Sequence, residues 1–387
     1  MLSRRQSRRE RHLQKESLVS RNGAILLEEV IKSIGPKYCP YRIFSEKELK
    51  IATNCYRSDH ILNEDGSYVL YWGIHEYRKI LVKKFSDRSI NNISRIIDDF
   101  VISLQIRNHK NVLTILGCCI ETEFPILVYE YSSKKTLSNL LHDVTVGKDT
   151  LPLENRPLAL SWESKLRIAT EIADAVTYMH ISTSTPIIHR DIKPINILLD
   201  GRNVVKLFDF ALSLKIPLGE DHVEAEVAGT FGYLDPEYFN SSQLTEMCDV
   251  YGFGVLLIEI LTETKPREFK CLRDLDLTDE EGSSSVSELD NASAVPVLSS
   301  KTLDQNEGDL TPSEFSRSFS LARANDLYSK KCILEVSLKI NKLGEGEIKQ
   351  LMECTILALE CTKYNPKERP SMKEVTEKLR RIKTMTC

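Results

Sequence analysis

The stretch IIHRDIKPINILLDGRNVVKLFDF, residues 187–210, decides the fold class. Its apolar positions form two short runs, 197–199 and 204–207, on either side of the dipeptide Asp200-Gly201. Short apolar runs bounded by a turn signal are typical of buried strands. The stretch therefore predicts two short strands around a turn, with polar residues placed before and after them.

Those polar residues have the types that phosphoryl transfer requires. Asp191 lies on the loop before the first strand and is predicted to accept the proton of a substrate hydroxyl, while Lys193 balances charge on the transferred phosphoryl group. Asn196 and Asp209 are predicted to supply oxygen ligands to Mg²⁺. The stretch thus predicts a catalytic pair and a metal-binding pair.

The pattern His-Arg-Asp-x-Lys-x-x-Asn-Ile-Leu-Leu-Asp, followed by Asp-Phe, resembles the protein kinases over roughly residues 44–383. A lone His-Arg-Asp is common, but the whole spacing is specific. The resemblance implies an α+β, bilobal protein-kinase fold, with ATP and Mg²⁺ as cofactors if the protein is active. It implies a small, mainly β N-lobe with one helix at 44–130, and a large, mainly α C-lobe at 131–383.

The predicted ATP site departs from the family pattern at its glycine-rich loop. Alignment on residues 71–73 places Asn63, Asp65 and Tyr68 where the family has Gly-x-Gly-x-x-Gly, and only Gly66 stands beside them. Side chains then occupy positions where backbone N–H groups should approach the ATP phosphates closely. We expect weak or altered ATP binding, with Gly66 the remaining loop glycine.

The resemblance also implies a lysine on the next strand and an acidic partner on the following helix. The lysine is expected at Lys83, with Lys84 as the alternative, and the acid at Asp99, with Asp98 as the alternative. Because Asp is one methylene shorter than the family's Glu, we expect it to reach the lysine less well, which weakens phosphate positioning.

Residues 124–131 are expected to form a strand that runs into the hinge between the lobes. Tyr129 would guard the back of the adenine pocket, and Glu130 and Tyr131 would offer hinge backbone groups to ATP. Farther on, the apolar repeat of residues 161–180 predicts the long core helix of the C-lobe, capped by Ser161.

The segment after Asp209 carries further departures. Ala211 follows Phe210 where the family has Gly, and strain of about 1–3 kcal/mol is expected if that backbone needs a positive φ. Glu224 and Glu226 stand where relatives carry a phosphorylatable Thr or Ser pair. They either replace the phosphate charge permanently or form a solvated acidic loop, and the sequence leaves both alternatives open.

Five residues are assigned structural roles by the resemblance. His189 and Arg190 belong to the catalytic loop, and Asp249 is expected to brace its backbone from below. Arg369 is expected to form an ion pair with Glu237 in the segment Asp-Pro-Glu. These features indicate a complete C-lobe scaffold.

The two regions outside the kinase pattern are polar. Residues 1–43 are predicted to be a basic N-terminal arm and a juxtamembrane-like segment, whose first 21 residues form a solvated disordered arm or contact an anionic membrane. Residues 21–56 resemble the juxtamembrane stretch of plant wall-associated receptor kinases, which implies the inner part of such a receptor without its outer part. Residues 268–322 are rich in serine and acids and are expected to be a disordered insertion: either a regulatory tail or an artefact of gene reading.

Composition bounds the class of protein. The chain of 387 residues has a formal charge of −4, which gives no nucleic-acid signature, and its ten cysteines include no Cys-x-x-Cys pair. Nothing approaches the ~20 continuous apolar residues of a membrane span, the first residues resemble no signal peptide, and Leu2 excludes N-myristoylation. We expect a reduced cytoplasmic protein, at most at the inner face of the plasma membrane.

Three functions stay open. The degraded loop favours a pseudokinase adaptor resembling a plant cytoplasmic group that partners with intracellular nucleotide-binding leucine-rich-repeat immune receptors and with other kinases. The retained Lys83, Asp191, Lys193, Asn196 and Asp209 favour an active serine/threonine kinase. A truncated receptor paralogue is the third.

Overall fold

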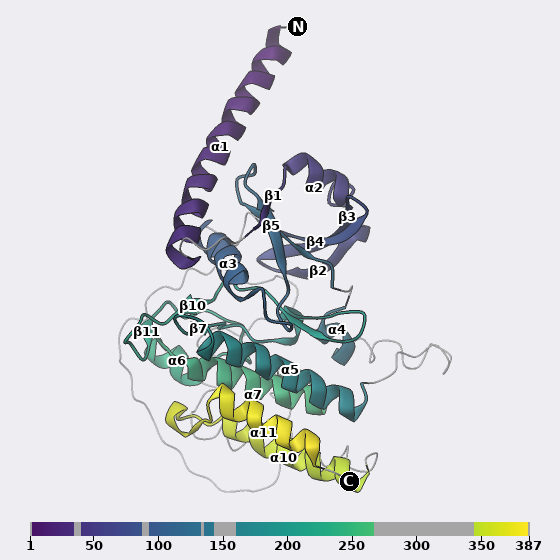
Figure 1. Ribbon diagram of the computed structural model, residues 1–387, viewed down its shortest axis with the longest axis vertical. Helices are drawn as coiled ribbons and strands as arrows, with labels where there is room; N and C mark the ends of the chain where they lie inside the picture. The colour runs from purple at the N-terminus through teal and green to yellow at the C-terminus, as the bar shows by residue number, and fades with distance from the viewer. Residues whose placement is uncertain are drawn as a thin grey trace, which may run out of the picture.

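The computed structural model describes residues 2–34, 40–86, 93–132, 135–142, 160–266 and 344–385. The insertion predicted at 268–322 lies outside them. A small lobe built on a β-sheet stands above a large helical lobe, which confirms the predicted α+β, bilobal kinase fold (Figure 1).

The small lobe is organised around one six-stranded sheet in the order β1-β5-β6-β4-β3-β2. Neighbouring strands are antiparallel, except that β1 runs parallel to β5. Helix α3 covers one face of the sheet and α2 the other. The elements are β1 (Arg42–Ile43), α2 (Glu46–Ala52), η1 (Ser58–His60), β2 (Ile61–Asp65), β3 (Tyr68–His75), β4 (Arg78–Phe85), α3 (Ile93–Ile106), β5 (Ile115–Cys119) and β6 (Ile126–Glu130).

Strand β4 shows why the sheet has two different faces. Successive side chains of a strand point to opposite sides. Leu81 and Phe85 accordingly belong to the core under α3, while Ile80 and Val82 belong to the core under α2. Position 83 shares the α3 face, so the strand directs this lysine into the interior.

The parallel pairing of β1 with β5 depends on a glycine. Gly117 lies opposite Arg42, and a Cβ at this position would lie 1.8 Å from the Arg42 carbonyl oxygen. No side chain fits at that distance. Since β1 begins at residue 42, the small-lobe sheet includes residues just before the boundary that the sequence indicated at 44.

Helix α1 (Leu2–Ile34) includes residues 2–21, so disorder, the first of the two alternatives for this arm, is wrong (Figure 1). Asn22 is fully buried and donates from Nδ2 to the carbonyls of Ile120 at 3.0 Å and Thr122 at 2.9 Å. Leu26 joins the core under α3. A buried amide that satisfies two carbonyls anchors the helix, and overall charge gives no sign of such an anchor.

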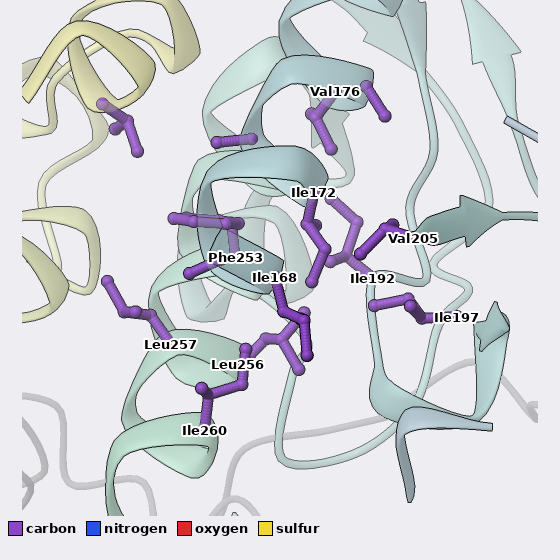
Figure 2. Close-up of a cluster of buried hydrophobic side chains, with 14 of the residues drawn as sticks. Ile168, Ile172, Val176, Ile192, Ile197, Val205, Phe253, Leu256, Leu257 and Ile260 are labelled. Carbon is purple, nitrogen blue, oxygen red and sulfur yellow. The ribbon is translucent and has the colours of Figure 1, made fainter. Parts of the chain in front are cut away.

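The large lobe packs its helices around two central ones, α5 and α7 (Figure 2). Helix α5 begins after Ser161, whose side chain accepts from the N–H of Ser164, as the sequence predicted. Strands β8 and β9 form the predicted pair, with Ile197 opposite Leu207 and Leu199 opposite Val205. The elements are α4 (Leu137–His142), α5 (Trp162–Ile181), β7 (Ile187–Ile188), η3 (Pro194–Asn196), β8 (Ile197–Leu199), β9 (Val205–Leu207), β10 (Leu214–Lys215), β11 (Val223–Glu224), α6 (Pro236–Ser241), β12 (Gln243–Leu244), α7 (Glu246–Thr262), α10 (Glu345–Cys361), η7 (Pro366–Glu368) and α11 (Met372–Thr384).

Candidate active site

The predicted lysine of the ATP site is Lys83, which is fully buried on β4. Its Nζ lies 2.6 Å from Asp99 on α3 and 2.5 Å from Asp209. Burial alone would lower the pKa of Lys83, but the two carboxylates raise it, so the ammonium stays charged. Lys84 points to the other face, where its ammonium lies over the ring of Tyr56. The structure therefore selects the first of the two candidates.

Asp99, the predicted partner on α3, is completely enclosed. Besides Lys83 it accepts hydrogen bonds from Tyr129 Oη at 3.3 Å, Ser103 Oγ at 3.3 Å and the N–H of Phe210 at 3.1 Å. Burial raises the pKa of this carboxyl, and the charge of Lys83 offsets part of that rise. The expectation that the shorter Asp reaches the lysine less well is wrong, because the contact forms at 2.6 Å.

The catalytic loop holds Asp191, Lys193 and Asn196 together. Lys193 Nζ lies 2.9 Å from Asp191 Oδ2, and Asn196 Nδ2 donates to the same oxygen at 3.1 Å. Thr230 joins them: its hydroxyl donates to Asp191 Oδ1 at 2.6 Å and accepts from Lys193 at 2.8 Å. Thr230 was not among the predicted catalytic residues, and its signal in the sequence is a hydroxyl residue shortly before the Asp-Pro-Glu segment.

Two side chains from the glycine-rich loop positions enter the site from β2 and β3. Asp65 Oδ2 lies 2.9 Å from Lys193 Nζ, so the hairpin reaches across to the catalytic loop. Tyr68 is buried, and its ring centre lies 4.3 Å from Lys83 Nζ in cation–π geometry. The exposed Gly66 forms the tip between the two strands. Two of the three departures identified in the sequence, Asp65 and Tyr68, therefore contact the lysines directly.

The positive φ of the metal-binding loop lies two residues before Ala211. Asp209 takes the positive φ, at 69°, whereas Ala211 does not appear among the described non-glycine residues with positive φ. The condition for strain at Ala211, a positive φ, is therefore not met. Phe210 is buried, and its ring lies edge-on to that of His189 with 5.3 Å between ring centres.

The hinge lies at the end of β6. The N–H of Glu130 donates to the Thr114 carbonyl at 2.9 Å, and its carboxylate lies 3.1 Å from Lys206. The ring of half-buried Tyr131 lies 5.1 Å from Lys79 Nζ. The Glu130 N–H already donates to Thr114, so it is not free to bind ATP. The ATP contacts expected from the other backbone groups of Glu130 and Tyr131 stay a prediction.

Asp249 at the start of α7 braces the catalytic loop as predicted. Its carboxylate accepts from the backbone N–H of His189 at 2.7 Å and from that of Arg190 at 2.9 Å. His180 Nε2 lies 2.9 Å from the same carboxylate. A buried carboxylate with three such partners fixes the loop that carries Asp191.

The ion pair predicted between Arg369 and Glu237 is wrong. Arg369 instead forms a bidentate ion pair with Asp235: its Nη1 and Nη2 lie 2.7 and 2.8 Å from the two carboxylate oxygens. Both side chains are almost completely buried. Glu237 lies in the first turn of α6, and its carboxylate shares a hydrogen bond with Tyr364. Two acids stand two positions apart in the Asp-Pro-Glu segment, and only packing decides which one faces the arginine.

The two acids of the activation segment do not approach Arg190. The Arg190 guanidinium instead bonds to the backbone carbonyls of Leu212 and Glu226 and to the Tyr238 hydroxyl. The Glu226 side chain is 75 % exposed, with Arg95 at 3.7 Å, and Glu224 is exposed on β11. Of the two alternatives left open, the geometry favours a solvated acidic loop, because both glutamate side chains are exposed and the Arg190 guanidinium bonds to other groups.

The site concentrates four carboxylates, Asp65, Asp99, Asp191 and Asp209, around two lysines. Burial would raise the pKa of Asp209, but Lys83 and Lys193 together lower it, so it stays ionised. Asn196 suits a metal ligand, because its Oδ1 is buried and no donor reaches it from the described residues. Asp209 and Asn196 are thus suited to hold the Mg²⁺ that serves phosphoryl transfer in kinases.

Known proteins with similar sequences agree with this geometry. A sequence profile of the protein kinase domain matches residues 66–379. The chain belongs to the protein kinase family. It is 36 % identical over 365 residues to wall-associated receptor kinase-like 1 of Arabidopsis thaliana, covering 94 % of this chain and 43 % of the relative.

Two further relatives come from the same plant. Wall-associated receptor kinase-like 6 is 42 % identical over 260 residues, covering 67 % of this chain and 39 % of the relative. Wall-associated receptor kinase 1 is 34 % identical over 370 residues, covering 95 % and 43 %. The chain thus spans less than half the length of these curated relatives. Across the part of the chain that the structure describes, no helix has both the length and the apolar character needed to cross a bilayer.

Proposed function

We propose that this member of the protein kinase family is a signalling protein with little or no phosphoryl transfer, a pseudokinase that acts as an adaptor. One observation carries the proposal: side chains at two loop-glycine positions contact the two lysines of the site. Asp65 pairs with Lys193, and the Tyr68 ring covers Lys83. In kinases these lysines serve the phosphates of ATP.

The electrostatic consequence of Asp65 is large. A carboxylate about 4 Å from one phosphate charge costs on the order of 4 kcal/mol at an effective dielectric constant of about 20. That bare repulsion corresponds to a roughly thousandfold loss of affinity, and the charge of Lys193, 2.9 Å from Asp65, reduces it. Lys83 is also fully buried between Asp99 and Asp209, so a phosphate must displace Tyr68 or a carboxylate to reach it. Both effects act against ATP in the closed hairpin.

An active serine/threonine kinase is the second candidate, and a specific observation favours it. Lys83 and Asp99 form their ion pair, and Asp191, Lys193 and Thr230 are joined by short hydrogen bonds. Most of the catalytic effect in phosphoryl transfer comes from positioned charges of this kind. A hairpin that swings outward would expose an intact set of groups.

The cellular role is part of the proposal. The relatives are plant wall-associated receptor kinases, which supports a role in plant immune or cell-surface signalling at the inner face of the plasma membrane. We propose as partners an intracellular nucleotide-binding leucine-rich-repeat immune receptor and another kinase. The basic residues of α1 support peripheral contact with an anionic membrane, worth about 1 kcal/mol per basic residue near the surface.

Nucleotide binding tests the proposal directly. The purified full chain is titrated with ATP, with and without Mg²⁺, by calorimetry and by thermal shift, since a ligand that binds the folded state raises its apparent stability. We expect no shift at millimolar ATP. The double variant Asp65→Gly, Tyr68→Gly restores two glycines of the family pattern and is expected to gain Mg²⁺-dependent binding, provided that circular dichroism shows it folded.

Phosphate transfer and partner binding separate the two candidates. Transfer by the wild type that Asp191→Asn abolishes would establish the active kinase and refute the pseudokinase. Transfer that survives this substitution would come from a contaminating kinase. For an adaptor, Asp191→Asn leaves partner binding and immune output unchanged, so the loss of either contradicts the proposal.

A further inference from the structure

The three carboxylates of Asp65, Asp191 and Asp209 meet where the β2–β3 hairpin contacts the catalytic loop. They come from three separate places: the end of β2, the catalytic loop, and the segment after β9. One ligand oxygen from each lies within 4.8 Å of the other two. Oxygen atoms at such separations can bind a single hard cation.

A second observation points to a ligand at the same place. Asn196 is fully buried, and its Nδ2 donates to the Asp191 carboxylate at 3.1 Å, so its amide lies against the cluster. The Oδ1 of the same amide has no hydrogen-bond donor among the described residues. A buried carbonyl-type oxygen without a donor is costly unless something else satisfies it, and a metal ion does so.

The net charge of the side chains around this cluster is what a divalent cation would neutralise. With Asp99 included, four carboxylates surround the two ammonium groups of Lys83 and Lys193, which leaves two negative charges. Lys193 already bridges two of the cluster's carboxylates, at 2.9 Å from Asp65 and 2.9 Å from Asp191. A divalent cation would complete the neutralisation that the lysines begin.

We propose that Asp65, Asp191 and Asp209, with Asn196 Oδ1, form a divalent-cation site that requires no nucleotide. In kinases the metal ions bridge phosphate oxygens of ATP. Here the chain itself supplies a carboxylate at a loop-glycine position, so Asp65 takes the place of the phosphate. Carboxylate and amide oxygens select Mg²⁺ or Mn²⁺ over softer metals. The inference rests on the proposed function only in taking the hairpin as closed.

Binding of this ion ties the small lobe to the large lobe. Asp65 belongs to the β2–β3 hairpin, while the other ligands belong to the large lobe. A cation among them therefore holds the hairpin on the catalytic loop and competes with the opening that ATP needs. The site links divalent-cation concentration to the shape that the protein offers to a partner.

The test is a Mn²⁺ titration of the nucleotide-free full chain, read by the electron paramagnetic resonance signal of free Mn²⁺ and by calorimetry. We expect one saturable site that Mg²⁺ competes for. Asp65→Asn removes a ligand charge and is expected to weaken Mn²⁺ affinity by roughly tenfold or more. Glu64→Gln is the matched control, because this exposed neighbour on β2 lies outside the cluster and its loss leaves affinity unchanged.

Two results would overturn the proposal. One is the absence of saturable Mn²⁺ binding in the folded wild type. The other is undiminished affinity in both Asp65→Asn and the second variant Asp65→Gly, which would leave the ion on Asp191, Asp209 and Asn196 without Asp65. Neither result depends on whether ATP binds or phosphate is transferred, so failure of this site and failure of the pseudokinase proposal are told apart.

Discussion

The buried ion pair between Arg369 and Asp235 makes the sharpest stability prediction. Arg369→Met keeps the length of the side chain and removes its charge. In the folded protein the Asp235 carboxylate, which is 1 % exposed, then has no opposite charge beside it. The main-chain carbonyls of Lys363, Tyr364 and Met247 also lose their hydrogen-bond donor. Each loss acts in the same direction.

The expected size follows from the burial. Breaking a buried pair by removing one partner costs about 3–5 kcal/mol, because the remaining charge is uncompensated. At roughly 2 °C per kcal/mol for a chain of this size, the melting temperature should fall by about 6–10 °C. Adding Asp235→Asn to Arg369→Met removes the unpaired buried charge and keeps a side-chain oxygen that caps α6. The double variant should therefore recover part of the lost stability.

Urea unfolding followed by circular dichroism, with differential scanning calorimetry, measures the effect. The matched control is Glu237→Gln, which keeps an acceptor for Tyr364 and should change stability by about 0.5 kcal/mol or less. If Glu237→Gln destabilises the protein as much as Arg369→Met does, the arginine pairs with Glu237 and the reasoning is refuted.

Three smaller predictions concern the N-lobe and the thiols. Hydrogen bonds from the residue that caps α2 lower the pKa of Glu48 to about 2, so its stabilisation is full above its ordinary pKa of 4.5 and is lost as pH falls from there to about 2. Glu48→Gln should therefore destabilise the wild type at pH 7 but not near pH 2, and an equal effect at both values would contradict this. Burial raises the pKa of the Cys354 thiol to about 12, so iodoacetamide at pH 8 should modify exposed Cys55 first by peptide mass spectrometry; the reverse order would count against the burial. Tyr129→Phe removes a hydrogen bond to a buried carboxylate and should cost about 1 kcal/mol in urea unfolding, whereas a neutral result would show that the bond contributes nothing.

Local spacing determined much of the site. Asp191, Lys193, Asn196 and Asp209 lie within nineteen residues of chain around one β-turn–β unit, so the order of residues also sets their relative places. The choice of Lys83 over Lys84 follows from strand alternation once a buried face is known. These parts of the fold could be predicted because the responsible contacts are close in sequence or repeat with a fixed period.

Contacts between distant residues were decided by tertiary structure. The sequence placed Asp65 at a glycine position, but only packing of the hairpin brings it to Lys193. Arg369 chooses Asp235 across a separation of 134 residues, and nothing local distinguishes this acid from Glu237. In both cases more than one residue has suitable chemistry. The packing of the surrounding side chains determines which charged group comes within reach of the lysine or the arginine.

Helix α1 shows the same division of causes. The sequence alone established that its first part is basic and polar, and such composition is typical of disorder. The tertiary structure adds Asn22, whose amide finds two carbonyls 98 and 100 residues away, and Leu26, which finds an apolar site under α3. Composition determined the charge of this segment, whereas its order depends on a surface that only the folded lobe provides.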